Sequence, residues 1–168
     1  KIAHQLADIG AVLSGSFDRD RAGVSLRTLS SKIERDAALD VLVRVVQKPD
    51  YATPVVKREQ ARLIAALREA EADPGDVASR AFYRAVYGEH AYAHDERGTV
   101  ASVGKVARKD LQAFHARHYT ASNAVIAIIG DVSRADAEAI AAKLTAGLPK
   151  GPVLPAVPAP APGKPVVE

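Results

Sequence analysis

Near the start of the chain, two short runs of alternating apolar and polar residues, AVLSGSFD and AGVSLRTL, flank the charged triplet RDR. Alternation with a period of two indicates strands that bury one face, and a short charged connection favours an antiparallel hairpin. The core has to be built from small aliphatic side chains, because only 5% of the residues are aromatic and Trp and Met are absent. Such a composition suits helices that pack closely on a sheet.

Most of the remaining sequence has helical periodicity. The spacing and the capping residues predict helices over residues 1–9, 31–48, 55–72, 76–88, 107–119 and 133–148. Ser30 or Ser31 is expected to cap the second helix, Asp76 the fourth and Ser133 the last. Residues 89–104 are predicted to form a loop, and NAVIAIIGD, residues 123–131, a buried strand.

Composition and charge exclude several classes of protein. The 168 residues suffice for one domain with a substantial core, and the 48% hydrophobic content is that of a soluble globular protein. The net charge of +3, from 23 basic and 20 acidic side chains spread along the sequence, does not predict a nucleic-acid-binding surface. No run approaches the roughly 20 apolar residues that span a bilayer, so no membrane span is expected. The absence of cysteine removes disulfides, thiolate nucleophiles and cysteine metal ligands.

Seven prolines fall within residues 149–165, in the sequence PKGPVLPAVPAPAPGKP. Proline does not continue a helix or a central strand, so this segment is predicted to be an extended, semi-rigid linker. We therefore expect one module over residues 1–148, then the linker and, at residues 166–168, a candidate start of another module. The chain opens on Lys1 within what looks like a helix, which indicates that the N-terminal part of the module is missing.

Two histidine pairs have spacings seen among metal ligands, but neither is accompanied by the rest of a zinc site. A catalytic zinc needs three protein ligands and an open position for water. His115 and His118 share one face of a predicted helix that offers no glutamate as a general base. His90 and His94 have acidic neighbours, but AYAHDERG has no helical pattern that would bring them together. We expect surface or interface histidines in the first case and a solvated loop in the second, with a metal site as the alternative.

Other catalytic patterns are absent from the sequence. A serine nucleophile on a strained turn commonly has the pattern GxSxG, which LSGSFD only imitates. Phosphate-binding loops use several glycines, whereas GDVSRADAEAI has one after a predicted strand. A strand that leads into a capped helix explains the second segment more simply.

The order of three segments resembles one known family. The segments are IGAVLSGSFDRDRAGVSLRTL, KREQARLIAALREAEADPGDVASRAFYRAVYGEHAYAHDERGTVASV and RKDLQAFHARHYTASNAVIAIIGDV. Together they resemble the insulinase and pitrilysin-type zinc metallopeptidases, in their processing-peptidase-like bacterial branch. The matching positions are Gly10-Ala11, Tyr92 through Gly98-Thr99, Tyr119, Asn123 and Gly130-Asp131. Two segments depart from the family pattern, because AYAHDERGT lacks the usual PYG and YTASN lacks the usual proline.

The resemblance implies an α+β fold, in which helices cover one face of a mostly antiparallel sheet. It also implies modules that occur in pairs, with two pairs enclosing an extended peptide in a chamber. The family's zinc site uses an H-x-x-E-H motif, whose histidines bind the metal and whose glutamate activates water, and a third ligand glutamate from a later helix. The motif does not occur in this sequence, and in a catalytic member it would lie upstream of Lys1.

The third zinc ligand can be sought on the third predicted helix. In active members this helix is approximately E-R-x-x-x-x-x-E with a D-P end, and aligning Glu59 and Asp73-Pro74 with these features puts Ala66 at the ligand position. An alanine methyl group cannot bind zinc. Glu69, three residues further on and displaced by roughly 60° around the helix, is a substitute only in a different register. Without metal ligands beside it, Glu59 is expected to form an ion pair with Arg62 at i, i+3.

The resemblance and the alanine together predict a non-catalytic module or subunit that binds no metal itself and is inactive alone. Zinc would belong to a homologous catalytic module or subunit, and an extended peptide would be the substrate. Two alternatives stay open: a catalytic module whose H-x-x-E-H helix lies upstream, and a non-proteolytic scaffold of the same fold, as in the respiratory cytochrome complex. Resemblance to bacterial members favours the periplasm over the cytoplasm.

Overall fold

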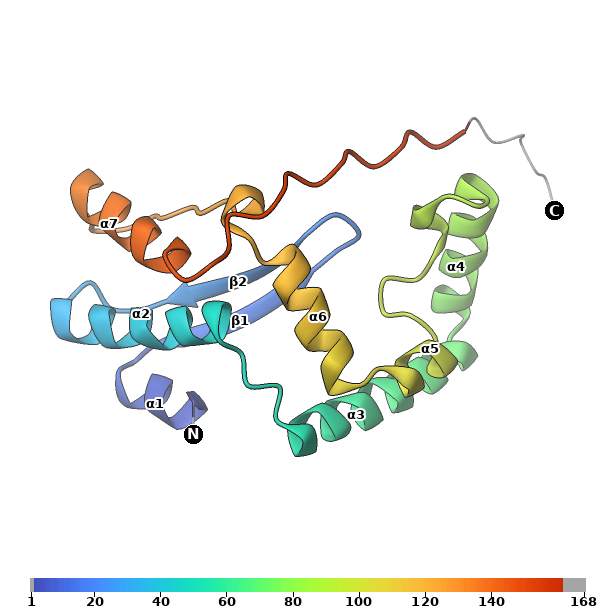
Figure 1. Ribbon diagram of the computed structural model, residues 1–168. Coiled ribbons are helices and arrows are strands. Elements are labelled where there is room, and N and C mark those ends of the chain that lie inside the picture. Colours follow the sequence, from blue (N-terminus) through green and yellow to red (C-terminus); the bar gives the residue numbers. More distant parts are fainter. Residues whose placement is uncertain (1, 162–168) are drawn as a thin grey trace. The chain divides into compact units, whose positions relative to one another are not determined.

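The computed structural model describes residues 2–161, which form two compact units. Unit 1 contains the residues up to Asp50 together with Gln112–Leu154, and unit 2 contains Tyr51–Leu111 and the described residues from Pro155 onward. Figure 1 shows the helices and strands of both units. The end of the predicted linker and the candidate start of another module, residues 162–168, lie outside the described residues.

Unit 1 is built on the predicted hairpin, whose strands are β1 (Val12–Phe17) and β2 (Ala22–Arg27). The two strands pair antiparallel, with Leu13 opposite Leu26. The carboxylate of Asp18 closes the turn, because it accepts hydrogen bonds from the backbone N–H groups of the second and third residues after it, at 2.9 and 3.0 Å.

Helices cover one face of this hairpin, in agreement with the predicted α+β class. They are α1 (Ile2–Asp8) and α2 (Lys32–Gln47). Leu13 and Leu26 lie on the covered face and pack against a core made of Leu6, Ala11, Ala38 and Val41. Ser31 occupies the position before α2, although its side chain makes no capping hydrogen bond.

Further elements complete unit 1: the C-terminal part of α6 (Arg108–His118), the 3-10 helix η2 (Ala121–Asn123) and α7 (Arg134–Thr145). Helix α7 is capped by Ser133 as predicted, because the hydroxyl accepts a hydrogen bond from the N–H of Asp136. Its C-terminal turn is joined to α2. The side-chain amide of Gln47 donates to the carbonyl oxygens of Lys143 and Leu144, at 2.8 and 3.1 Å.

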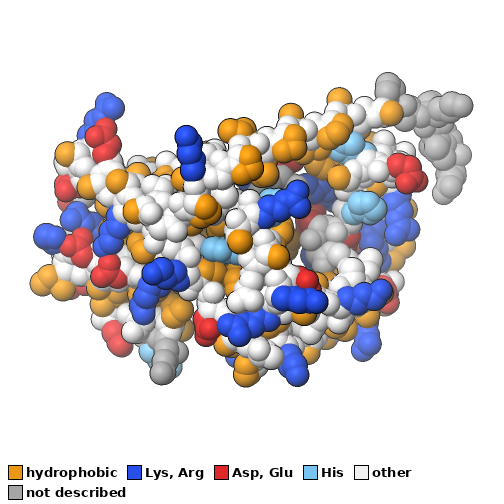
Figure 2. All heavy atoms as spheres, viewed as in Figure 1, with side chains coloured by type: hydrophobic (Ala, Val, Ile, Leu, Met, Phe, Trp, Pro, Cys, Tyr) orange, Lys and Arg blue, Asp and Glu red, His pale blue; other side chains and the backbone are white. Residues whose placement is uncertain are grey.

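The first part of the Pro-rich segment, residues 149–154, is extended and hydrogen-bonded to η2 (Figure 1). Two backbone N–H groups of η2 donate to its first two carbonyl oxygens. The side-chain amide of Asn123 donates to the carbonyl of Pro152 at 3.0 Å and accepts from the N–H of Leu154 at 3.1 Å. Hydrophobic side chains are exposed along the segment, at the top of Figure 2. The hydrogen bonds to η2 thus hold residues 149–154 on unit 1.

The strand predicted over residues 123–131 is not formed among the described residues. Residues 124–129 have no regular secondary structure, and the backbone groups of residues 125–129 make no hydrogen bond within the described chain. Val125 and Ile129 are 97% and 98% exposed. The prediction was wrong because an apolar run indicates a buried strand without indicating its partner, and within residues 2–161 β1 and β2 pair only with each other.

Unit 2 contains α3 (Thr53–Ala72), α4 (Pro74–Tyr87), the 3-10 helix η1 (Ala91–Ala93), α5 (Val100–Lys105) and the start of α6. Leu67 and Ala70 are buried on α3, on the stripe that helical spacing predicts. The side-chain amide of Gln60 joins α3 to the end of α5 by donating to the carbonyl of Val103 at 2.7 Å. Within residues 2–161, no helix combines the length and the apolar character that crossing a bilayer requires.

Two predictions for unit 2 need correction. Asp73, and not Asp76, caps α4: its carboxylate accepts from the N–H of Asp76 at 2.9 Å, and the helix begins at Pro74. Part of the predicted loop over residues 89–104 is helical, because Thr99 and Ser102 form a capping box that starts α5.

Candidate functional site

The position predicted for the third zinc ligand lies on the exposed side of α3. Ala66 is exposed, beside the buried Leu67, and Glu69 is exposed as well. The carboxylate of Glu59 lies 2.8 Å from the guanidinium of Arg58 and 3.7 Å from that of Arg62. The second contact is the predicted i, i+3 ion pair. Glu59 is thus engaged by two arginines.

The residues of α3 do not fit a zinc site. The methyl group of Ala66 has no electron pair to donate, and the carboxylate of Glu59 is shared between two guanidinium groups. In the described part of the chain, no three His, Asp or Glu side chains are grouped so that they could hold a metal ion. No metal-dependent step is therefore assigned to these residues.

The histidines of α6 have different partners. The Nε2 atom of His115 donates to the backbone carbonyl of Val46, at 2.7 Å. His118 lies against Phe114, with ring centroids 4.5 Å apart. The helical spacing is present as predicted, and the two side chains serve packing and hydrogen bonding within unit 1.

The histidines near η1 are also not arranged as a pair of ligands. The Nδ1 atom of His90 accepts from the backbone N–H of Tyr92 at 3.1 Å, so its Nε2 carries the proton and donates to the carbonyl of Pro158 at 2.8 Å. Both nitrogens of His90 are engaged. His94 is exposed and lines a hollow in unit 2.

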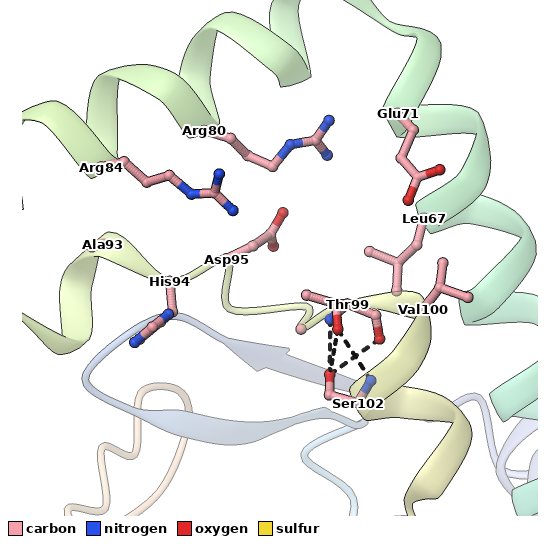
Figure 3. Close-up of a pocket in the computed structure, with 11 residues that line it drawn as sticks. Leu67, Glu71, Arg80, Arg84, Ala93, His94, Asp95, Thr99, Val100 and Ser102 are labelled. Carbon is pink, nitrogen blue, oxygen red and sulfur yellow. Dashed lines mark hydrogen bonds between the residues drawn. The ribbon is translucent and has the colours of Figure 1, made fainter. Parts of the chain in front are cut away.

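This hollow has a volume of about 450 Å³ and is the strongest candidate site in unit 2 (Figure 3). Its walls come from α3, α4 and the segment of residues 93–102. The apolar part of the lining includes Leu67 and Ala93, which are buried. The charged part comes mainly from α4, where Arg80 and Arg84 point into the hollow (Figure 3).

The two arginines have few partners. Arg80 donates to the backbone carbonyl of Ala70 at 3.1 Å. Arg84 makes no side-chain hydrogen bond or ion pair with any residue that the structure describes. Each guanidinium has five N–H donors, and most of these donors make no hydrogen bond to a residue that the structure describes.

A cluster of charges that includes the lining residue Asp95 lies beside the hollow. Asp95 accepts hydrogen bonds from Arg97, at 2.9 Å from its backbone N–H and at 3.2 and 3.1 Å from Nε and Nη2 of its guanidinium. The same guanidinium also reaches Asp76 on α4, at 2.9 Å. The hydrogen bond from the Arg97 side chain holds the pKa of Asp95 below its usual range, and the two carboxylates raise the pKa of Arg97. This cluster ties the segment that precedes α5 to the start of α4.

Several positions that carry the family resemblance set the backbone geometry. Gly10 and Gly98 have φ of +64° and +81°, a region that side chains other than glycine rarely adopt. Thr99 starts α5, and Asn123 binds the Pro-rich segment. These residues thus support the fold of the module.

Sequence reasoning missed Arg80, Arg84 and Arg97. The two arginines of α4 are four residues apart, a spacing that places them on one helical face and is visible in the sequence. The hollow into which both side chains point cannot be predicted from the sequence, because it exists only once residues 93–102 have folded beside α3 and α4.

Comparison with known proteins identifies the type of module. A family model described as the peptidase M16 inactive domain matches residues 105–168. The crystal structure of a peptidase M16 inactive domain from Pseudomonas fluorescens superimposes with a TM-score of 0.94 at 39% sequence identity, over 97% of this chain and 40% of that chain. Over nearly its whole length, the chain is therefore similar to an inactive domain of the M16 peptidases. The predicted resemblance to a non-catalytic insulinase-type module is confirmed.

The curated relatives that this chain matches are longer proteins. An uncharacterised zinc protease of Mycobacterium leprae is 28% identical over 131 residues, which are 78% of this chain and 29% of that protein. A probable β subunit of the mitochondrial-processing peptidase of Arabidopsis thaliana is 26% identical over 78% of this chain and 24% of its own length. The chain thus spans about a quarter of these relatives. Complex III of Candida albicans shares the fold, with a TM-score of 0.63 at 20% identity.

Proposed function

We propose that this M16 module is a non-catalytic wall of a peptidase chamber. A homologous catalytic module or subunit would supply the zinc ion and the glutamate that activates water, and the two together would enclose an extended peptide. The observation that carries the proposal is Ala66, which stands at the expected ligand position in a chain that superimposes closely on an inactive M16 domain. Zinc proteases among the relatives support the presence of the metal elsewhere in the assembly.

Metal binding and activity test this assignment. The chain is purified with and without a homologous subunit that carries H-x-x-E-H, and bound zinc and cleavage of a quenched fluorescent peptide are measured. We expect no stoichiometric zinc on the chain alone, and peptide cleavage only when the catalytic subunit is present.

Two substitutions on α3 separate the proposal from a truncated catalytic module. In that alternative, Glu69 is the metal ligand, so zinc binding by the full-length protein would be lost in Glu69→Gln and would not depend on Ala66→Glu. Glu71→Gln is the matched control, because Glu71 is also exposed on α3 and two residues away. Loss of zinc in Glu69→Gln alone would refute the non-catalytic assignment.

A non-proteolytic scaffold is the second candidate function. Subunit 1 of the bovine cytochrome b-c1 complex is 23% identical over 144 residues, which cover 86% of this chain and 30% of that subunit. Affinity purification of the tagged chain from its source cells discriminates the two. A partner that carries H-x-x-E-H supports the peptidase, and subunits of a respiratory complex support the scaffold.

A further inference from the structure

Arg80 and Arg84 place two like charges one helical turn apart on α4, and both guanidinium groups point into the hollow (Figure 3). Like charges at this spacing repel each other, and an anion between them removes the repulsion. The carboxylate of Asp95 lies beside the two arginines in Figure 3. It is the first candidate for that anion.

Asp95 makes no hydrogen bond to the arginines of α4, although the charge of Arg80 contributes to lowering its pKa. Its two oxygens accept three hydrogen bonds from Arg97, all of 3.2 Å or less. Arg80 binds one backbone carbonyl, and Arg84 binds no side chain or carbonyl within residues 2–161. The hollow therefore presents two guanidinium groups whose hydrogen-bonding capacity is not filled by the described residues.

The rest of the lining restricts the kind of anion. Leu67 and Ala93 are 4% and 8% exposed and provide an apolar surface inside the hollow. Glu71 adds a carboxylate to the α3 side of the lining (Figure 3). A nearby negative charge disfavours ions of high charge such as phosphate, while a single carboxylate beside an apolar group satisfies both parts of the lining.

We propose that the hollow binds a carboxylate group of a peptide, held by Arg80 and Arg84, with an adjacent apolar side chain against Leu67 and Ala93. The inference rests on the proposed function for the peptide nature of the ligand. The carboxylate is either the C-terminal group or the side chain of Asp or Glu. Both sources present two oxygens in the geometry that guanidinium groups bind.

Three fluorescein-labelled peptides distinguish the sources. One ends in Ala-Leu with a free C-terminus, one ends in amidated Ala-Leu, and one ends in amidated Asp-Leu. Binding to the 168-residue chain is measured by fluorescence anisotropy at low and high salt. We expect the free acid to bind about tenfold more tightly than the plain amide, and salt to weaken the free acid most.

Arg84→Gln is the test variant, because its side chain has no partner among the described residues whose loss would disturb the fold. It should weaken the free acid about tenfold and abolish the difference between acid and amide. Arg68→Gln is the matched control, since it removes the same charge from an exposed position on α3 outside the hollow. This control should leave all affinities unchanged.

The outcomes separate the site from the proposed function. Tight binding of the amidated Asp peptide, lost in Arg84→Gln, supports the site and assigns the carboxylate to a side chain. The inference is overturned if neither carboxylate peptide, the free acid or the amidated Asp peptide, binds more tightly than the plain amide, or if Arg84→Gln does not reduce that preference. None of these measurements needs a catalytic partner, so absence of cleavage in the reconstituted enzyme would count against the chamber and not against the carboxylate site.

Discussion

Two connecting segments differ in how far hydrogen bonds stabilise them. The first lies between α4 and α5, residues 88–99, and the second lies between η2 and α7, residues 124–133. The first is polar and is held by hydrogen bonds within unit 2, chiefly those of Arg97. The second contains Val125 and Ile129, which are almost fully exposed, and residues 125–129 lack backbone hydrogen bonds to any described residue. Polar side chains close in sequence can satisfy one another, whereas an apolar strand depends on a partner that its own sequence does not specify.

The largest expected effect comes from Gly98→Val in the polar segment. Gly98 has a φ of +81°, and a Cβ atom there would lie 2.9 Å from the hydroxyl of Ser102, within the capping box of α5. We expect a loss of about 3 kcal/mol in the free energy of unfolding, from backbone strain and a weakened cap. Urea denaturation followed by circular dichroism measures it. Gly104→Ala, in the same helix and with open space at its Cβ, should be neutral or slightly stabilising.

Asp95→Asn should have the next largest effect, because it removes the charge that Arg97 binds. The substitution is expected to lower the free energy of unfolding by about 1.5 kcal/mol at pH 7. The pKa of Asp95 is lower in the folded state than its unfolded value of about 3.9, so this contribution is complete above that value and is lost as the pH falls through the folded pKa. In denaturation curves over a pH series, the difference in stability between wild type and variant should therefore be largest at pH 7 and shrink as the pH falls below about 3.9. A difference that persists in acid would contradict the ionic origin.

The smallest effect on stability is expected in the apolar segment. Lysine at Val125 and Ile129 should change the free energy of unfolding by no more than about 0.5 kcal/mol, since both side chains already face solvent. The double variant should instead reduce self-association at high concentration, because it charges an exposed apolar strand-like segment. Sedimentation velocity and denaturation test the two statements. A loss of more than about 1 kcal/mol would show that the segment is covered in solution.

The same contrast explains which features the sequence predicts. The hairpin of β1 and β2 and most helices follow from local periodicity, and Ala66 was placed by the order of motif residues along α3. The cap of α4 could have been found, since Pro74 at the first helical position points to Asp73 before it. The missing strand pairing and the hollow could not, because both depend on residues far apart in the sequence.

Asn123 also determines how far the Pro-rich segment can extend. Because its amide binds Pro152 and Leu154, residues 149–154 follow the surface of unit 1. They therefore add nothing to the distance that the rest of the segment can span from unit 1. Six extended residues at roughly 3.1 Å each would otherwise add about 19 Å to the tether. A shorter tether raises the effective concentration of whatever it carries, so Asn123, together with the two backbone hydrogen bonds of η2, sets a length scale for contacts made from beyond Leu154.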